Sequence, residues 1–226
     1  MRLSIVIPAL DEASGIADTL AALAPLVARG AEVVVVDGGS RDDTVALARA
    51  QGARVLAAAR GRARQMNAGA AAAGGDALLF LHADTRLPPG ADARVLGALE
   101  RRPWGRFDVR IDGEARTLAL VAALMNLRSR LTGIATGDQA IFVRREAFVA
   151  VGGFPDQPLM EDIELSRRLR RIGRPACLRD RAITSGRRWM TRGVWRTILL
   201  MWRLRLAYWL GANPERLRAR YERRAP

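Results

Sequence analysis

Four short apolar runs in the first part of the chain predict buried β-strands. The runs are nearly uninterrupted, and turn residues such as Pro8, Gly38 and Gly74 lie beside them. A run of this kind is typical of a strand that is covered on both faces of a sheet. The predicted strands cover residues 3–7, 33–36, 54–57 and 77–81.

Helical patterns separate these runs. Apolar residues recur at the spacing of one helix face from Ser14, the expected N-cap, to about Arg29. A second helix is expected from Asp42-Asp43 to about Ala50, and an alanine-rich helix follows Gly61. Strands that alternate with helices predict an α/β fold with a Rossmann-like, mostly parallel sheet and right-handed crossovers.

The alternation loosens after residue 90. Residues 104–111 and 140–143 predict two further strands, and residues 118–127 form a strongly apolar helical pattern. A basic helix is expected to begin near Met160. Neither an internal repeat nor a low-complexity linker divides the chain, so we expect one domain with a tail.

Polar clusters follow three of the predicted strands. Pro8–Glu12, Asp37–Ser40 and His82–Asp84 each come directly after an apolar run. The carboxyl ends of parallel strands meet at one edge of a sheet, and open α/β folds bind their ligands there. We therefore expect the three clusters to lie together at the functional edge of the domain.

Composition limits the compartment and the class of protein. Half of the 226 residues are hydrophobic, which is enough for a sizeable core. The one cysteine, Cys177, cannot form an intrachain disulfide and fits a reducing compartment, so we expect a cytoplasmic protein. Pro8 interrupts the first apolar run too early for a signal peptide, and we expect no membrane-spanning helix.

Charge is distributed unevenly along the chain. The formal net charge is +14, and all 37 basic residues are arginine. Residues 1–162 hold 19 arginines and 19 acids, whereas residues 163–226 hold 18 arginines and 4 acids. A neutral body with a cationic end predicts contact with a polyanion, for which nucleic acid and anionic lipid are the two candidates.

The polar residues indicate nucleotide chemistry. Asp37 can accept hydrogen bonds from a nucleobase or ribose, and Arg62, at a predicted helix start, can face phosphate. Asp84 is a suitable ligand for a divalent cation that bridges diphosphate oxygens. Glu161 and Asp162 supply carboxylates for general-base catalysis. The Asp37 loop lacks the glycine spacing of a dinucleotide site, which disfavours a dehydrogenase.

Two other functions are consistent with part of the sequence. A nucleotidyltransferase also uses a nucleotide fold and metal-binding carboxylates, but it commonly carries a glycine-rich basic loop after its first strand. Here that loop, Pro8–Glu12, is acidic and lacks glycine. A non-enzymatic protein that binds nucleic acid or membrane would explain the cationic end, but it would leave the acidic clusters without a role.

Six motifs occur in a specific order along the chain. They are Ser4–Glu12, Val35–Thr44, Asn67–Gly69, Leu81–Asp84, Gly137-Asp138 and Glu161-Asp162. This series resembles the family 2 glycosyltransferases of the GT-A fold, and the resemblance runs from Ser4 to about Trp189. It implies inverting transfer of a sugar, with a hexosyl group expected, from a nucleotide-diphospho-sugar. UDP is the favoured nucleotide, and Mg2+ or Mn2+ is the implied cofactor.

The resemblance also implies a role for individual residues. Asp162 is the implied base, with Glu161 beside it, and Asp84 is the implied metal ligand. Arg187-Arg188-Trp189 resembles a reduced form of a Gln-x-x-Arg-Trp element near the leaving diphosphate. The residues implied on the nucleotide-sugar side are Pro8, Ala9, Glu12, Asp37, Gly39, Arg62, Asn67, His82, Ala83 and Asp84. Those implied on the acceptor and diphosphate side are Gly137, Asp138, Gln139, Arg188 and Trp189.

One departure from the family pattern affects the metal site. His82 stands where the family usually carries the first acid of Asp-x-Asp. Two interpretations stay open, a metal-binding histidine and a neutral buried histidine that hydrogen-bonds the loop. The His-Ala-Asp variant resembles a bacterial subgroup likened to diaponeurosporenoate glycosyltransferases, which implies a lipid-like acceptor with a hydroxyl or carboxyl group.

Residues 191–226 predict a basic amphipathic tail beyond a GT-A domain of residues 1–190. Trp195, Trp202 and Trp209 recur at helical spacing among leucines and arginines. This composition is typical of a helix in a membrane interface, and it also suits a helix that packs on the core with solvated arginines. We expect peripheral contact with the cytoplasmic face of an anionic membrane, and nucleic acid is disfavoured.

Overall fold

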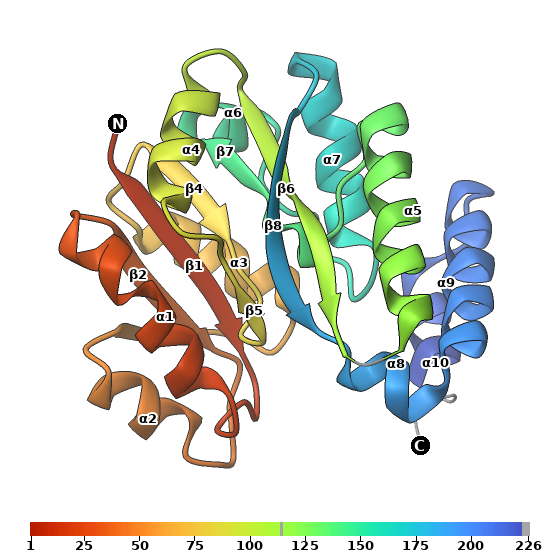
Figure 1. Ribbon diagram of the computed structural model, residues 1–226, viewed down its shortest axis with the longest axis horizontal. Coiled ribbons are helices and arrows are strands. Elements are labelled where there is room, and N and C mark those ends of the chain that lie inside the picture. Colours follow the sequence, from red (N-terminus) through yellow and green to blue (C-terminus); the bar gives the residue numbers. More distant parts are fainter. Residues whose placement is uncertain (114, 223–226) are drawn as a thin grey trace.

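The computed structural model describes residues 1–113 and 115–222, and it is an α/β protein (Figure 1). Its strands form a sheet of order β3-β2-β1-β4-β7-β6-β8-β5. The strands are β1 (Leu3–Ala9), β2 (Glu32–Asp37), β3 (Arg54–Ala57), β4 (Ala77–Phe80), β5 (Thr85–Arg86), β6 (Trp104–Asp112), β7 (Phe142–Arg144) and β8 (Ala176–Ser185).

Helices cover both faces of this sheet. They are α1 (Ile16–Ala28), α2 (Thr44–Ala50), α3 (Arg62–Ala72), α4 (Ala91–Leu99), α5 (Arg116–Thr132), α6 (Arg145–Ala150), α7 (Glu161–Ile172), α8 (Arg187–Arg192), α9 (Val194–Trp209) and α10 (Pro214–Glu222), with a short 3-10 turn, η1 (Gly137–Gln139). The helices predicted from the apolar spacing are present, and α5 extends beyond residues 118–127 at both ends.

The central strands are buried on both faces, as the apolar runs predict. In β4, Leu79 packs with the cluster that contains α1, α2 and α4, whereas Leu78 and Phe80 pack with α3, α6 and α7. Successive side chains of a strand point to opposite faces, so a strand between two helical layers must be apolar at every position.

Six of the strands run in one direction. Strands β1, β2, β3 and β4 pair in parallel, and β7 pairs antiparallel with both β4 and β6. Strand β6 therefore runs parallel to β4, and β8 pairs in parallel with β6. The carboxyl ends of these strands meet at the lower edge of the sheet in Figure 1.

Glycine allows α3 to lie close to the sheet. A Cβ atom on Gly69 would lie 2.4 Å from Cγ1 of Val6 and 2.8 Å from Cγ2 of Val36. These separations are too short for any side chain, so Gly69 fixes the distance between α3 and the strands β1 and β2. The Asn67–Gly69 motif thus includes a packing requirement that the spacing of motifs alone does not reveal.

Two predicted helix starts differ from the structure. Helix α1 begins one residue after its N-cap Gly15, and Ser14 lies before that cap and is exposed. Helix α2 begins at Thr44, and Asp42 lies in the turn before it. The Asp42 carboxylate accepts hydrogen bonds from the backbone N–H groups of Thr44 and Ala13, so it links two loops.

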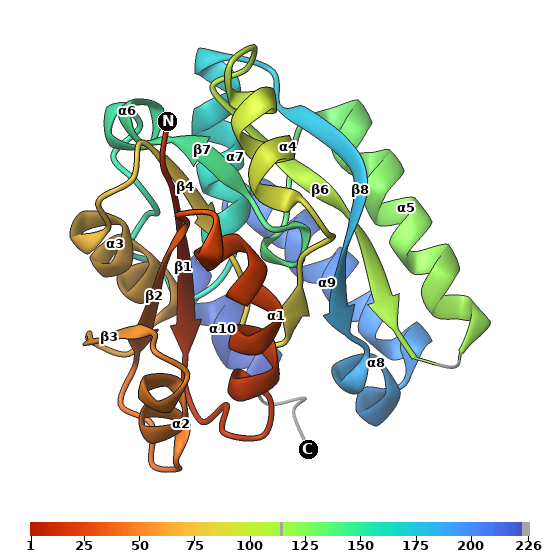
Figure 2. The ribbon, with the colours of Figure 1, turned by 60° about the vertical axis from the view of Figure 1, so that its left-hand side comes forward.

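The carboxyl-terminal helices pack on the rest of the domain. Leu200 and Leu204 of α9 and Leu217 of α10 are buried against Met160, which directly precedes α7. Figure 2 shows α9 and α10 behind the sheet. Of the two expectations for the tail, packing on the core is therefore confirmed for one face of α9. No helix in the described part of the chain is long and apolar enough to cross a membrane.

Candidate active site

Two loops at the carboxyl edge of the sheet hold each other through reciprocal hydrogen bonds. The backbone N–H of Asp11 donates to Oγ of Ser40 at 3.0 Å, and the N–H of Arg41 donates to Oδ1 of Asp11 at 2.8 Å. The N–H of Glu12 donates to Oγ1 of Thr44 at 2.8 Å. The clusters after β1 and β2 therefore form one unit, as their positions after parallel strands predict.

Asp37 is buried and organises its own loop. Its carboxylate accepts hydrogen bonds from the N–H groups of Gly39, at 3.0 Å, and Ser40, at 3.1 Å, and from the Ser40 hydroxyl. A carboxylate offers about four acceptor positions, so these bonds leave limited capacity for a ligand. The contact of Asp37 with a nucleoside stays a prediction, and the structure shows its direct contact with its own loop.

Gln65, for which the sequence predicts no role, fixes the ends of two strands. Nε2 of Gln65, on α3, donates to the carbonyl oxygens of Ala9 and Val36, both at 2.8 Å. The side chain is 4% exposed. Its signal in the sequence is a polar residue on the buried, alanine-rich face of a helix. Gln65 thus positions the predicted pocket residues Pro8 and Ala9 without facing the solvent.

Asp84 lies at this edge, close to Glu12. Asp84 is exposed, and its carbonyl accepts a hydrogen bond from the N–H of Ser185, at the end of β8, at 3.2 Å. Burial and the nearby charge of Asp84 raise the pKa of Glu12. Nη2 of Arg187 lies 3.9 Å from Oε2 of Glu12. The cluster His82–Asp84 therefore lies beside the clusters after β1 and β2, and the end of β8 lies there too.

His82 faces other protein groups with both of its ring nitrogens. Nδ1 lies 3.3 Å from Oδ1 of Asp138. Nε2 is buried and has no hydrogen-bond partner among the described residues, and it lies so close to Gly137 that a Cβ atom there would be 2.3 Å away. This arrangement favours the interpretation of His82 as a buried residue that braces the Gly137 turn over its interpretation as a metal ligand.

Asp84 is suited to a cation that is shared with a substrate. No group of three or more His, Cys, Asp or Glu side chains arranged to hold a metal occurs among the described residues. Mg2+ is commonly held by one or two carboxylates, with substrate phosphates and water completing its shell. A single exposed carboxylate beside the nucleotide edge therefore fits a cation that arrives with a diphosphate.

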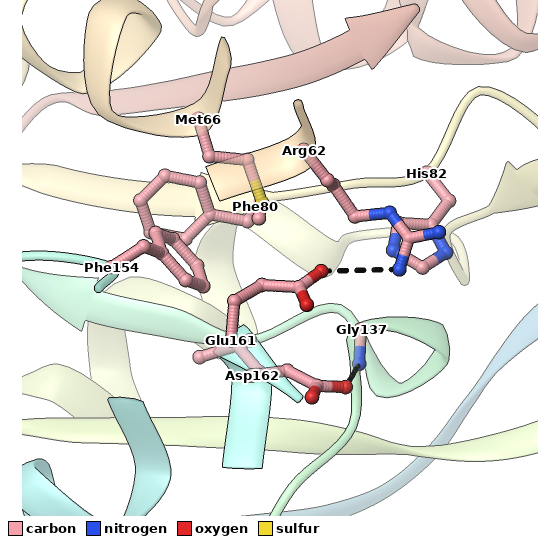
Figure 3. A pocket seen from close by; sticks show the side chains of 9 residues that line it. Arg62, Met66, Phe80, His82, Gly137, Phe154, Glu161 and Asp162 are labelled. Atoms are coloured by element: carbon pink, nitrogen blue, oxygen red, sulfur yellow. Dashed lines mark hydrogen bonds and ion pairs between the residues drawn. The ribbon is translucent and has the colours of Figure 1, made fainter. Parts of the chain in front are cut away.

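A pocket next to this edge joins charged groups to an apolar wall. Figure 3 shows its lining residues, which come from α3, β4, the η1 turn and the start of α7. Its polar members include Arg62, His82, Glu161 and Asp162, and its apolar members are Met66, Phe80, Ile141 and Phe154.

Asp162 is held at the first turn of α7 with its carboxylate toward the η1 turn. Oδ2 accepts a hydrogen bond from the N–H of Gly137 at 2.9 Å, and Oδ1 accepts one from the N–H of Ile163 at 2.8 Å. Burial and the neighbouring charge of Glu161 raise the pKa of Asp162 to about 6. A carboxylate with this pKa is ionised at neutral pH and is a stronger base than an exposed aspartate.

Glu161 forms an ion pair with Arg62 across the pocket. The side chain of Glu161 is 3% exposed, and its Oε1 lies 3.2 Å from Nη1 of Arg62 (Figure 3). Burial opposes the charge of Arg62, but Glu161, Asp162 and Asp138 outweigh this effect and raise its pKa. Arg62, predicted to face phosphate, therefore lies where it neutralises the carboxylates of the pocket.

A second arginine near Asp162 was not predicted from the sequence. Both terminal nitrogens of Arg128, on α5, are buried, and no group in the described part of the chain forms a hydrogen bond with them. Burial lowers the pKa of Arg128, and the charge of Asp162 opposes that effect. Arg128 directly follows the apolar helical pattern of residues 118–127, which gives no reason to single it out.

Three predicted site residues contact other parts of the protein, and the side chain of a fourth lies outside the described residues. The Asn67 amide donates to the Phe154 carbonyl at 2.8 Å and accepts from its N–H at 3.0 Å, so it braces the turn before α7. Gln139 is fully buried, its Oε1 accepts a hydrogen bond from the N–H of Thr136 at 3.2 Å, and its place on the acceptor side stays a prediction. Trp189 packs on the cluster between β6 and α5. The side chain of Arg188 lies outside the described residues, and Arg187 is the arginine near Glu12.

The remaining predicted residues lie at or beside the edge. Ala83 is buried, and its carbonyl accepts the hydroxyl hydrogen of Thr19. Asp138 is partly exposed and adjoins His82, as described above. Gly39 lies in the Asp37 loop with a positive φ of 91°.

Met160 sets the direction from which α7 enters the site. It has a φ of 65°, a left-handed conformation that is uncommon for a residue with a side chain. Its side chain is 6% exposed and packs against Leu200, Leu204 and Leu217 of the carboxyl-terminal helices. The tail therefore contacts the residue immediately before Glu161 and Asp162.

Comparison with known proteins shows which family and which solved structures the chain resembles. A family described as glycosyl transferase family 2 matches residues 4–148. The chain is similar in structure to TarS residues 1–349 from S. aureus, with a TM-score of 0.64 and 17% identity over 82% of this chain and 61% of that chain. No curated protein matches it significantly.

A second similar structure is glucosyl-3-phosphoglycerate synthase from Mycobacterium tuberculosis in complex with Mn2+, UDP and glucosyl-3-phosphoglycerate. Its TM-score is 0.61, with 25% identity over 80% of this chain and 70% of that chain. The chain spans about three fifths of the TarS chain that it matches. The predicted GT-A fold is confirmed by these similarities.

Proposed function

Because the chain belongs to glycosyl transferase family 2, we propose that it is an inverting glycosyltransferase that uses a nucleotide-diphospho-sugar. The observation that carries this proposal is the buried carboxylate of Asp162, whose pKa is raised to about 6, in a pocket beside the edge that holds Asp84. UDP is the favoured nucleotide, since TarS has been crystallised with UDP-GlcNAc and the mycobacterial synthase with UDP. Transfer of a hexosyl group is proposed on the same basis.

The donor lies along the three loops in this proposal. The Asp37 loop and the residues Pro8, Ala9 and Glu12 contact the nucleoside, and Asp84 lies toward the diphosphate. A divalent cation, Mg2+ or Mn2+, held by Asp84 when bound, would neutralise the charge that develops on the leaving diphosphate. The Arg187 side chain, which is 64% exposed and reaches toward Glu12, can contribute a second positive charge to the same group.

Asp162 acts as the general base in this proposal. The acceptor oxygen forms a bond to the anomeric carbon while the bond from that carbon to the diphosphate breaks, which inverts the configuration. The proton of an acceptor hydroxyl passes to the Asp162 carboxylate. The N–H groups of Gly137 and Ile163 fix the orientation of that carboxylate before the acceptor arrives.

The acceptor is proposed to be lipid-like and to present a hydroxyl or carboxyl group. Support comes from the resemblance of His82–Asp84 to the His-Ala-Asp subgroup and from the apolar wall formed by Met66, Phe80 and Phe154. A nucleotidyltransferase is disfavoured, since the loop after β1 is acidic and the family match covers it.

A thermal-shift panel tests the donor proposal. UDP-glucose, UDP-GlcNAc, a GDP sugar and a dTDP sugar are each added with Mn2+ to the wild type. Ligands that bind only the native state raise its melting temperature by mass action, so we expect the UDP sugars to give the largest rise. Asp84→Asn should lose that rise. Asp156→Asn, at an exposed acid paired with Arg64, is the matched control and should keep it.

Donor turnover completes the test. The wild type should release UDP from the stabilising UDP sugar slowly in water and faster when a suitable acceptor alcohol is supplied. The proposal fails if none of the four sugars changes the melting temperature and none is consumed.

A further inference from the structure

The outer face of α9 is apolar and exposed along its whole length. Trp195, Trp202 and Trp209 are 66%, 67% and 80% exposed, and Leu199 and Leu206 lie between them. With 3.6 residues per turn, these five side chains and Leu210 fall within an arc of roughly 100°. The opposite face carries the buried residues Leu200 and Leu204. Helix α9 therefore has two apolar faces, of which the structure covers one.

Arginines border the exposed face on both sides. Arg196 and Arg203 follow one margin of the arc, and Arg205 follows the other. Residues 181–214 contain seven arginines and no acid. Arginine stems lie along apolar surface while their guanidinium groups reach outward, so this pattern pairs an apolar stripe with a cationic rim.

Helix α5 presents a second stripe of the same kind. Leu120, Leu124, Leu127 and Leu131 are each at least half exposed and recur at intervals of three and four residues. The segment from residue 115 to residue 137 also lacks acids. Nine of the fifteen exposed large apolar residues in the described part of the chain lie on α5 and α9.

The two helices belong to one flank of the molecule. Figure 1 shows both beyond β6, on the right of the view. Val194 and Ile198, near the start of α9, pack against the cluster that contains Leu118, Val121 and Ala122 of α5. The two stripes therefore start from a shared core, and we define the docking face as the exposed residues Leu120, Leu124, Leu127, Leu131, Trp195, Leu199, Trp202, Leu206, Trp209 and Leu210.

We propose that the docking face binds the surface of an anionic phospholipid membrane. Exposed apolar residues that gather on one flank of a molecule indicate an interaction site. Tryptophan and arginine around an apolar stripe suit the boundary between acyl chains and headgroups, and the absence of acids suits a negatively charged surface. Since no described helix can span a bilayer, the contact is peripheral.

This docking goes beyond the proposed transfer and does not require it. It gives that transfer a location, because the buried face of α9 contacts Met160 and so lies next to the pocket of Asp162.

Vesicle co-sedimentation of the full chain tests the proposal. Vesicles of phosphatidylcholine alone are compared with vesicles that contain phosphatidylglycerol. We expect strong binding to the anionic vesicles and weak binding to the neutral ones. The triple variant Trp195→Ala/Trp202→Ala/Trp209→Ala should lower the partition coefficient by about tenfold or more, because the buried apolar area sets the strength of such binding.

The matched control removes three exposed apolar residues elsewhere, with Val27→Ala/Val149→Ala/Ile172→Ala. It should bind like the wild type. The variant Leu124→Ala/Leu127→Ala removes apolar area of α5 from the docking face and should bind anionic vesicles more weakly than the wild type. Circular dichroism and melting temperature establish that each variant is folded. Quenching of tryptophan fluorescence by brominated lipid should occur in the wild type.

Three results would overturn the proposal. One is equal sedimentation of the tryptophan variant and the wild type. Another is the absence of binding to anionic vesicles by a folded wild type. The third is a wild-type dimer that becomes a monomer in the tryptophan variant and does not bind vesicles, since a second copy of the chain would then cover the face.

Discussion

The pocket around Asp162 and the docking face of α5 and α9 depart from ordinary residue placement in opposite ways. The pocket buries carboxylates, which are almost never fully buried unless they are paired. The docking face exposes tryptophan and leucine, which usually lie inside. In the pocket both buried carboxylates have fixed partners, Arg62 for Glu161 and the Gly137 N–H for Asp162. The side chains of the docking face present their apolar surface outward.

This difference separates two kinds of functional region. The partners in the pocket orient its groups in advance, as catalysis requires. The docking face needs no such orientation, because apolar burial is not directional and a membrane surface adapts to it. Substitutions in the pocket should therefore change chemistry strongly, whereas substitutions on the face should change location and leave the fold intact.

The largest expected effect is on turnover in Asp162→Asn. Removing a general base commonly lowers the rate by about 10²–10⁴-fold, and the amide cannot accept the acceptor proton. The measurement is the initial rate of sugar transfer at saturating donor. Asp156→Asn is the control and should keep the wild-type rate. A rate in Asp162→Asn within a factor of two of the wild type would exclude Asp162 as the base.

The next effect contrasts the two faces of α9. Leu204→Ala, at a residue that is 2% exposed, should lower the free energy of unfolding by about 2–5 kcal/mol. Leu206→Ala, at a residue that is 57% exposed, should change it by no more than about 0.5 kcal/mol. Denaturation in urea measures both. Similar losses in the two variants would contradict the orientation of α9.

Asp162→Asn should also stabilise the protein at alkaline pH. The pKa of Asp162 is raised to about 6, so ionisation of this buried group disfavours the folded state as the pH rises from about 4 to 6. Above that window the penalty is constant, at most about 3 kcal/mol. The melting temperature at pH 8 should therefore be higher in the variant than in the wild type. If the melting temperatures of the variant and the wild type differed by the same amount at pH 4 and at pH 8, that result would argue against the raised pKa of Asp162.

The smallest expected effect is the pH dependence of transfer to an alcohol. Only the ionised carboxylate can accept a proton, so the rate should fall by about tenfold per pH unit below the pKa of about 6. The rate should level off above that pKa. The pH–rate profile of the variant Trp195→Ala/Trp202→Ala/Trp209→Ala should have the same midpoint as that of the wild type, because the docking face does not touch Asp162. A midpoint near 4 would indicate that the base is an exposed carboxylate.

The fold and the sheet edge could be predicted because their signals are local. Strand β4 is apolar at every position because both of its faces are covered, and Asp84 follows it because the chain leaves the core there. The helices α1 and α3 could be predicted because apolar spacing and alanine content are also local signals. Three polar clusters after parallel strands must converge, whatever the sequence between them.

The rest of the site depends on contacts between segments that are distant in the chain. Gln139 and Asn67 resemble ligand-binding residues in their motifs, but their amides serve the η1 turn and the Phe154 turn. The charges of Arg128 and Asp162 interact although the two residues are distant in the chain, and no local pattern predicts this. In β6, Arg106 is fully buried and pairs with Asp108, which a charged residue in a strand does not predict.

The left-handed conformation of Met160 makes the carboxyl-terminal helices part of the active-site architecture. A residue with a side chain held in such a region costs about 1–3 kcal/mol and persists only while its surroundings enforce it. Here the enforcing surroundings are Leu200, Leu204 and Leu217. Removal of residues 191–226 would free Met160 to relax, and α7 would then present Glu161 and Asp162 at a different angle. A chain without residues 191–226 can therefore fold and still lack catalytic activity.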